Sequence, residues 1–214
     1  MGQVNELKDF TRGQLDAALM QIGQEAGMGT ADGIRAFLAH ELVISKPVRS
    51  WRKDPDGTIR LSVTSNGLTG EQWIAHFEKK GIRLSDWAKS VLRSTDFRPT
   101  TGVTTEIAVL PGEMFNDTDR CTSNIRAKAD ERKFVKPNAE VVCLIRDNFS
   151  DEEIEAMGLI WIVAMHEPIN DSGGLPSLLG AVRRGGGRWL RAYYDQPGLG
   201  WGRGCGFAFV VPQA

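Results

Sequence analysis

The chain has 214 residues, of which 41% are hydrophobic, so it can bury a substantial core in one large domain or in one domain with an extension. Its 26 basic and 27 acidic residues give a net charge of -1. This balance argues against a protein that coats nucleic acid or an anionic membrane by bulk electrostatic attraction. Any such function must come from a local patch.

The longest apolar runs, Leu159–Met165 and Phe207–Val211, are far shorter than the roughly 20 residues that span a bilayer. The first ten residues, MGQVNELKDF, include two acids and no apolar core, unlike a secretory signal. The three cysteines, Cys121, Cys143 and Cys205, are widely spaced, which favours free thiols over a disulfide framework. We therefore expect a cytoplasmic chain without a membrane span.

Three expected helix starts share one pattern, a capping box with a hydrophobic staple. In each, an apolar residue precedes a hydroxyl residue, and Gln or Glu follows three positions later. The hydroxyl residues are Thr11, Thr69 and Ser150. The hydroxyl accepts from an early backbone N–H while the Gln or Glu reaches back to the cap, so the pattern predicts where each helix begins.

The first hundred residues are predicted to form a helix-rich N-terminal region. The expected helices begin at Thr11 and cover Ala31–Leu42, Gly70–Lys80 and Ser85–Ser94. The turn signal Asp54-Pro55-Asp56-Gly57 precedes an alternating apolar run, which predicts a β-hairpin near residues 51–64.

The run Arg98-Pro99-Thr100-Thr101-Gly102 reads as a connector, so a second domain is predicted over residues 101–214. It is expected to contain a strand over Thr104–Leu110, helices over Asp119–Arg132, Ala139–Asp147 and Ser150–Met157, and strands over Leu159–Met165, Leu178–Val182, Trp189–Tyr194 and Phe207–Val211. Helices that are segregated from a mostly antiparallel sheet define the α+β class.

Catalytic motifs are not found. The histidines His40, His76 and His166 have no metal-ligand spacing, and two of the three are expected to face solvent. The pair His166-Glu167 is interpreted as a strand end and not as a catalytic pair, because adjacent strand residues point to opposite faces. Gly185-Gly186-Gly187 lacks the Lys-Ser/Thr of a phosphate loop and is typical of a hairpin tip. We therefore expect no enzyme activity and no cofactor.

A metal site is also not expected. The run Asn170-Asp171-Ser172-Gly173-Gly174 offers oxygen ligands, but its spacing matches no calcium loop. An ordinary turn is the favoured interpretation, and a metal near Asp171 stays an open alternative.

The segment Leu175–Ala214 differs in composition from the rest of the chain. It contains no Lys, Glu or Met, and eleven of the 24 glycines lie at Gly173 or later. Its arginines are interleaved with tryptophans and tyrosines. Tyr, Trp, Arg and Gly build antibody-like binding sites, because they give large contact areas at low entropic cost. Positive charge beside aromatic rings also binds single-stranded nucleic acid, which is the alternative function.

The element order, with Gly158-Leu159-Ile160-Trp161-Ile162-Val163 opening the sheet and Gly206-Phe207-Ala208-Phe209 closing it, resembles the C-type lectin fold. More narrowly, residues from about Thr104 to Ala214 resemble the variable proteins of diversity-generating retroelements. In that family a reverse transcriptase copies a template repeat with errors at adenines and overwrites the 3′ end of the target gene. The altered residues lie on a ligand-binding face. One departure is that Phe207-Ala208-Phe209 stands where many members carry Gly-Phe-Arg.

The resemblance implies a codon signature in the diversified segment, about residues 178–211. Adenine-directed change of AAC or AAT codons excludes Lys, Glu, Gln, Met and Trp, and the only residues of these types here are Trp189, Gln196 and Trp201. A glycine-rich hairpin region that lacks Lys and Glu by chance is the plain alternative.

The resemblance also implies roles for single residues. Trp189 and Trp201 are expected to support the surface from beneath. The expected variable, ligand-facing positions are Arg183, Arg184, Arg188, Arg191, Tyr193, Tyr194, Asp195, Leu199, Arg203 and Cys205. Formylglycine-generating enzymes have a similar fold but need paired cysteines, which Cys205 alone does not supply. The resemblance thus implies a non-enzymatic protein that binds a protein or surface ligand.

Overall fold

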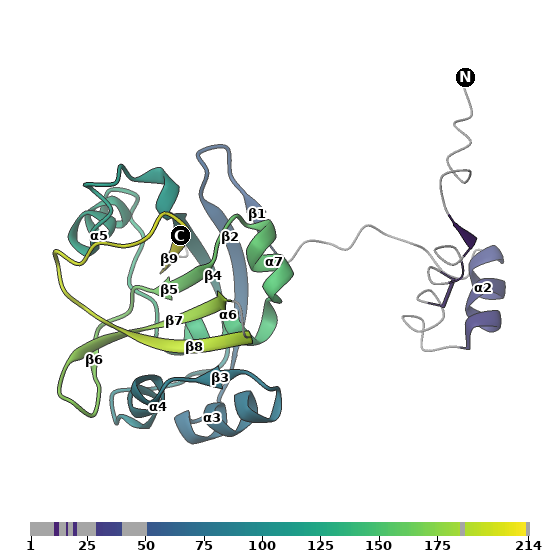
Figure 1. Cartoon of the computed structure of the whole chain (residues 1–214), viewed down its shortest axis with the longest axis horizontal. Coiled ribbons are helices and arrows are strands. Elements are labelled where there is room, and N and C mark those ends of the chain that lie inside the picture. Colours follow the sequence, from purple (N-terminus) through teal and green to yellow (C-terminus); the bar gives the residue numbers. More distant parts are fainter. Residues whose placement is uncertain are drawn as a thin grey trace. The chain divides into compact units, whose positions relative to one another are not determined.

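The computed structural model describes residues 29–39, 51–184 and 187–212, together with Thr11, Arg12, Asp16, Leu19 and Met20. The chain divides into two compact units, Met1–Val48 and Arg49–Ala214. Helix α2 (Thr30–Leu38) belongs to the first unit (Figure 1). Most of the helix expected from Thr11 and the end of the helix expected over Ala31–Leu42 lie outside the described residues.

A nine-stranded sheet organises the second unit, with the order β1-β2-β4-β9-β5-β7-β8-β3 and with β6 paired to β7. The strands are β1 (Trp51–Lys53), β2 (Ile59–Asn66), β3 (Arg83–Leu84), β4 (Thr101–Pro111), β5 (Trp161–Ala164), β6 (Ile169–Asn170), β7 (Pro176–Arg184), β8 (Gly187–Tyr194) and β9 (Cys205–Val210). Most neighbours run antiparallel, whereas β5 with β9 and β3 with β8 are parallel. The expected hairpin and the predicted α+β class are confirmed.

The helices of this unit begin close to the predicted positions. They are α3 (Gly70–Lys79), α4 (Asp86–Arg93), α5 (Thr122–Glu131), α6 (Glu140–Asn148) and α7 (Asp151–Ala156), with a 3₁₀ turn η2 (Gly112–Met114) after β4. Two of the three predicted capping boxes are present: Thr69 exchanges hydrogen bonds with Gln72, and Ser150 exchanges them with Glu153. The third, at Thr11, involves Gln14, which lies outside the described residues. The local pattern therefore determines these helix starts.

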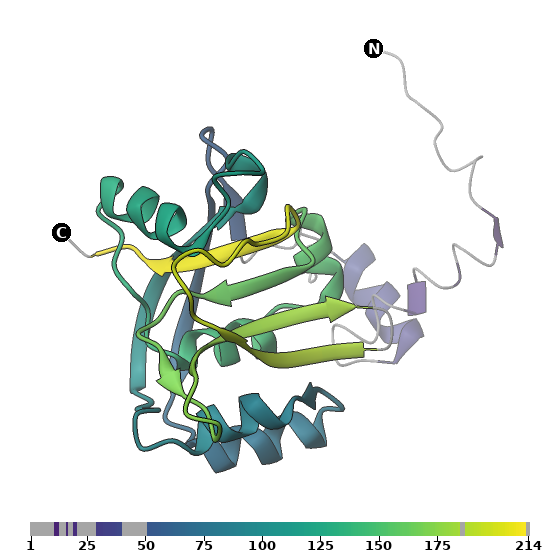
Figure 2. The ribbon, with the colours of Figure 1, turned by 60° about the vertical axis from the view of Figure 1, so that its left-hand side comes forward.

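The two faces of the sheet are covered differently. One face, here named the helix-covered face, packs against α3, α4, α6 and α7 in a single apolar cluster. In Figures 1 and 2, α3 and α4 lie along the edge formed by β8 and β3. The other face packs against side chains of α5 and of the loop between β8 and β9 in a smaller cluster.

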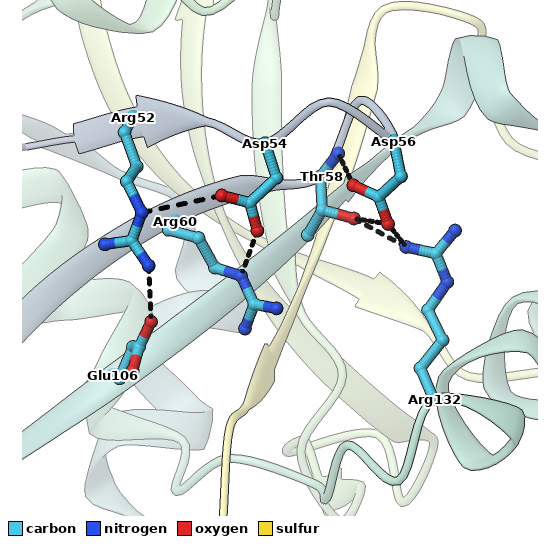
Figure 3. Close-up of polar contacts among 7 residues, drawn as sticks. All are labelled: Arg52, Asp54, Asp56, Thr58, Arg60, Glu106 and Arg132. Atoms are coloured by element: carbon cyan, nitrogen blue, oxygen red, sulfur yellow. Dashed lines mark hydrogen bonds and ion pairs between the residues drawn. The ribbon is translucent and has the colours of Figure 1, made fainter.

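Ion pairs tie the β1–β2 hairpin to later segments of the chain, as Figure 3 shows. Arg52 Nη2 lies 3.2 Å from Glu106 Oε1 on β4. Arg132, at the end of α5, places Nη1 2.7 Å from Oδ2 of Asp56 in the hairpin turn. The hairpin is thus joined to the C-terminal half by side chains as well as by its pairing with β4.

The domain boundary expected near residue 100 is corrected by this arrangement. Strand β2 pairs with β4 from Ile59↔Val109 to Asn66↔Thr101, so residues on both sides of the expected boundary share one sheet. The compact units divide between Val48 and Arg49. The connector pattern at 98–102 lies between α4 and β4. Turn residues indicate only that the chain changes direction, and such a change does not require a new domain.

Candidate functional site

Side chains from three neighbouring strands meet on the sheet face opposite the helix-covered face. Trp161 on β5, Val182 on β7 and Trp189 on β8 are aligned by their Cα pairing, so their side chains point the same way. Arg191 and Tyr193 follow Trp189 at alternate positions of β8. We name these five residues the aromatic face. All of them except Val182 are partly exposed.

The rings of this face interlock. The ring of Tyr193 lies edge to face against Trp161, with 5.3 Å between the centroids, and against Trp201, with 5.7 Å. Gly180 makes room for Tyr193, because a Cβ atom on Gly180 would lie 2.7 Å from Tyr193 Cε2. Trp201 is anchored in turn, since its Nε1 donates to Thr122 Oγ1 at 3.0 Å. Edge-to-face contacts of this kind stabilise fixed ring orientations.

Two guanidinium groups lie over the ring of Trp189. The Cζ atom of Arg191 is 4.7 Å from the ring centroid, and that of Arg83 is 5.4 Å away. Arg83 belongs to β3 and pairs directly with Trp189. Cation–π attraction favours both positions over the indole. Among the described residues, no carboxylate forms an ion pair with either guanidinium, and the buried Nε of Arg191 has no hydrogen-bond partner.

Two predicted ligand-facing arginines lie on the opposite face instead. Arg183 and Arg188 are offset by one residue from the aromatic face, and side chains alternate along a strand. Arg183 Nε donates to the Leu159 carbonyl at 2.9 Å. Arg188 Nη2 donates to the Arg146 carbonyl at 2.8 Å. Both arginines thus bond to main-chain carbonyls of the helix-covered side.

Cys205 is a second correction, because it is fully buried and was expected to face a ligand. It begins β9 beside Trp161, under the aromatic cluster. Burial raises the pKa of its thiol to about 12, so the group is a neutral packing element.

The other predicted positions are divided between the loop and the strand ends. Arg203 is exposed and Leu199 is half-buried, and both lie in the loop between β8 and β9. The side chain of Asp195 is buried, and its Oδ2 lies 2.9 Å from Nη2 of Arg126 on α5. Tyr194 is 44% exposed at the end of β8. Arg184 pairs with Gly187 at the β7–β8 turn, and the first two glycines of that turn are outside the described residues.

The two predicted scaffold tryptophans have different environments. Trp201 is 7% exposed and packs against Phe207 at 5.7 Å between ring centroids, which is the placement expected of a supporting residue. Trp189 is partly exposed and belongs to the aromatic face itself, so it is corrected from support to surface.

The histidine at the end of β5 is structural. His166 is 1% exposed, and its Nδ1 donates to the Glu167 carbonyl at 2.6 Å while its Nε2 accepts from the Leu179 N–H at 3.0 Å. Burial lowers the pKa of the imidazole to about 4, which keeps the ring neutral. His76 is half-buried and bonds to Asp147, so neither of these two histidines projects freely into solvent; His40 lies outside the described residues.

The predicted turn at Asp171 is confirmed. Its Oδ1 accepts from the N–H groups of Gly173 at 2.8 Å and Leu175 at 3.1 Å, and its Oδ2 accepts from the Ser177 hydroxyl at 3.1 Å. Across the described part of the chain, no three His, Cys, Asp or Glu side chains are arranged to hold a metal ion. No described helix is both long enough and apolar enough to span a membrane.

Three residues of this site were missed by the sequence reasoning. The sequence predicts Trp161 only as part of a buried strand, and Gly180 carries no signal of its own. Arg83 lies in a strand of two residues, which is too short for an alternation pattern. A turn glycine, Gly81, comes two residues before Arg83 and was the one local sign that the chain changes direction there.

No protein-family model matches the chain, and neither a curated protein nor a solved structure matches it.

Proposed function

We propose that this chain is a non-enzymatic ligand-binding protein whose C-terminal segment forms a diversified surface on a C-type lectin-like domain. The observation that carries the proposal is the aromatic face. Its partly exposed Trp, Arg and Tyr side chains are held in place by a buried aromatic cluster beneath them. Such residues give large contact areas with little loss of conformational entropy on binding.

The strand connectivity supports the lectin-like part of the proposal. The terminal strand β9 pairs with β4, and α5 and α6 lie between β4 and β5 in the chain. Strands β7 and β8 then form the hairpin that carries most of the aromatic face. This is the element order on which the resemblance to C-type lectins is based.

The geometry also narrows the set of positions that variation should affect. Arg191 and Tyr193 lie on the aromatic face, and Leu199 and Arg203 lie in the loop that follows β8. The buried residue Trp201, by contrast, supports the neighbouring rings. Under this proposal, the first group varies between sibling genes and Trp201 does not.

The nucleotide sequence around the gene tests the proposal. A near-copy of the region that encodes residues 178–211, mismatched at adenines and close to a reverse transcriptase gene, is the expected finding. Sibling copies should then differ at the surface group and keep Trp161, Gly180 and Trp201. Substitutions spread evenly over the whole chain, without a template copy, would contradict the retroelement origin.

Single-stranded nucleic acid is the second candidate ligand, because arginines and aromatic rings occur together on the face. It is the weaker candidate for a geometric reason. The indole of Trp189 already carries two guanidiniums, and the rings of Trp161 and Tyr193 meet edge to face, so little ring surface is free for stacked bases. Binding to single-stranded DNA that falls steeply with salt would favour this candidate.

A further inference from the structure

The aromatic face extends beyond the C-terminal segment onto β3. This strand lies at the edge of the sheet and pairs in parallel with β8, through Arg83↔Trp189 and Leu84↔Leu190. Leu84 packs toward the helix-covered core, while Arg83 is exposed and lies over Trp189. A residue from the segment between α3 and α4 is therefore built into the binding surface.

The chemistry of this edge selects for negative charge. Arg83 and Arg191 both lie over Trp189, and neither is neutralised by a carboxylate among the described residues. A guanidinium that lies over an aromatic ring and has no carboxylate partner can still donate its N–H groups to a ligand. That arrangement suits a planar carboxylate, which accepts two parallel hydrogen bonds from one guanidinium.

A cleft beside Arg83 gives such a group a place to enter. It has a volume of about 490 Å³. It is lined by Glu78, Gly81, Ile82, Arg83, Leu84, Lys89 and Trp189. Glu78 is the only acidic residue of this lining, and it is paired with Lys89 at 2.7 Å. The charge that remains for a ligand in the cleft is the positive charge of Arg83.

We infer that the β3–β8 edge, through Arg83, Trp189 and Arg191, docks carboxylate side chains of an acidic protein segment. This inference rests on the proposed function, since it names the kind of partner that the aromatic face takes. Charge complementarity supports it: the exposed Arg83, which has no carboxylate partner among the described residues, lines a cleft whose one acidic residue is already paired with Lys89. Arg83 lies outside the diversified segment and is the same in every variant, while the neighbouring variable positions of β8 change the affinity for the ligand.

The experiment uses the full chain and a fluorescein-labelled hexaglutamate peptide, followed by fluorescence anisotropy at low salt. Saturable binding by the unchanged protein is expected. Arg83→Gln should weaken it by about tenfold, the effect of one charge-assisted bidentate contact. Arg98→Gln is the matched control, because it removes the same charge from another exposed arginine, and its binding should stay within about twofold of the unchanged protein.

Two further arms make the result decisive. Arg83→Lys keeps the charge but loses the planar fork, so binding should fall between the unchanged protein and Arg83→Gln. Full affinity in Arg83→Lys would contradict the stacked-guanidinium geometry. A labelled hexathymidylate that binds more tightly than hexaglutamate would overturn the acidic-protein assignment, as would equal losses in Arg83→Gln and Arg98→Gln. Far-UV circular dichroism confirms that each variant is folded.

Failure of this inference is separable from failure of the proposed function. A template copy beside the gene together with no saturable hexaglutamate binding would remove the carboxylate site and leave the diversified surface standing. Binding that depends on Arg83, without any template copy, would leave the acidic docking site standing and remove the retroelement origin.

Discussion

The helix-covered face and the aromatic face belong to the same strands, yet their arginines have different environments. On the helix-covered face, Arg146 is completely buried and donates to the carbonyls of Val182 and Phe149. On the aromatic face, Arg191 is partly exposed and lies over a ring, with no carboxylate partner among the described residues. Burial and hydrogen-bond partners thus distinguish Arg146, which stabilises the fold, from Arg191, which a ligand can contact.

Strand β8 shows this distinction within a few residues. Arg188 and Arg191 are separated by two residues and have opposite environments, because an odd offset along a strand places side chains on opposite faces. Composition alone treats the two arginines as equivalent. The comparison teaches that a diversified segment must be divided by face before its residues are assigned to a ligand.

The largest expected effect is on the helix-covered face. Arg146→Ala removes a donor to the Val182 carbonyl and leaves the Phe149 carbonyl with only the longer 3.4 Å bond from Arg188 Nη2. It also leaves Asp151 without its partner at 2.8 Å. The free energy of unfolding should fall by about 4 kcal/mol in urea denaturation. Arg98→Ala, at an exposed site, should change it little. A loss below about 1 kcal/mol for Arg146→Ala would show that the buried arginine is not needed for the fold.

The second effect concerns pH. His166 is neutral in the folded state, with its pKa lowered by burial from 6.5 to about 4. The unfolded chain therefore binds more protons between these values, and stability should fall as the pH drops below 6.5, by up to about 3 kcal/mol at pH 4. Urea denaturation between pH 7 and pH 4 measures it. In His166→Gln this part of the pH dependence should disappear; an unchanged profile would assign it to the carboxylates.

The third prediction tests the support of the aromatic face. Gly180→Ala places a methyl group 2.7 Å from Tyr193 Cε2, which the close-packed ring must move to avoid. Overpacking of this kind should cost about 2 kcal/mol and change the near-UV circular dichroism of the ring cluster. Gly198→Ala is the control, since its Cβ would meet no atom within 4 Å. Equal effects of the two substitutions would mean that Gly180 is not a packing requirement.

The smallest predicted effect compares two adjacent positions. Asp195→Ala breaks the 2.9 Å ion pair with Arg126, in which the Asp195 side chain is 6% exposed, and should cost about 1 kcal/mol. Tyr194→Ala, at a 44% exposed position, should stay within about 0.5 kcal/mol. Thermal denaturation of both variants measures the difference. A larger loss from Tyr194→Ala would place Tyr194 in the structural group.

Much of the second unit was predictable from local signals. The capping boxes at Thr69 and Ser150, the turn at Asp171 and the hairpin over 51–64 are all present. Each depends on residues within a few positions of one another. Strand β3 was not predictable, because its two residues are recruited by pairing with β8 and carry no period of their own.

The site was predictable only in part, for a related reason. The composition of the segment after Leu175 predicted that the hairpin and the loop of this segment carry the binding surface. It did not separate Arg191 from Arg188, nor the buried Cys205 from the exposed Arg203. Those distinctions depend on strand register and on what covers each face, and both are set by residues from other parts of the chain.

The sequence by itself determined where helices and turns begin, since caps and turn residues act on their immediate neighbours. It also determined an unusual supply of Arg, Trp, Tyr and Gly near the C-terminus. Only the tertiary structure decided which of these residues share a surface. It placed Arg83 against Trp189, because parallel pairing of an edge strand brings together segments that are distant in the chain.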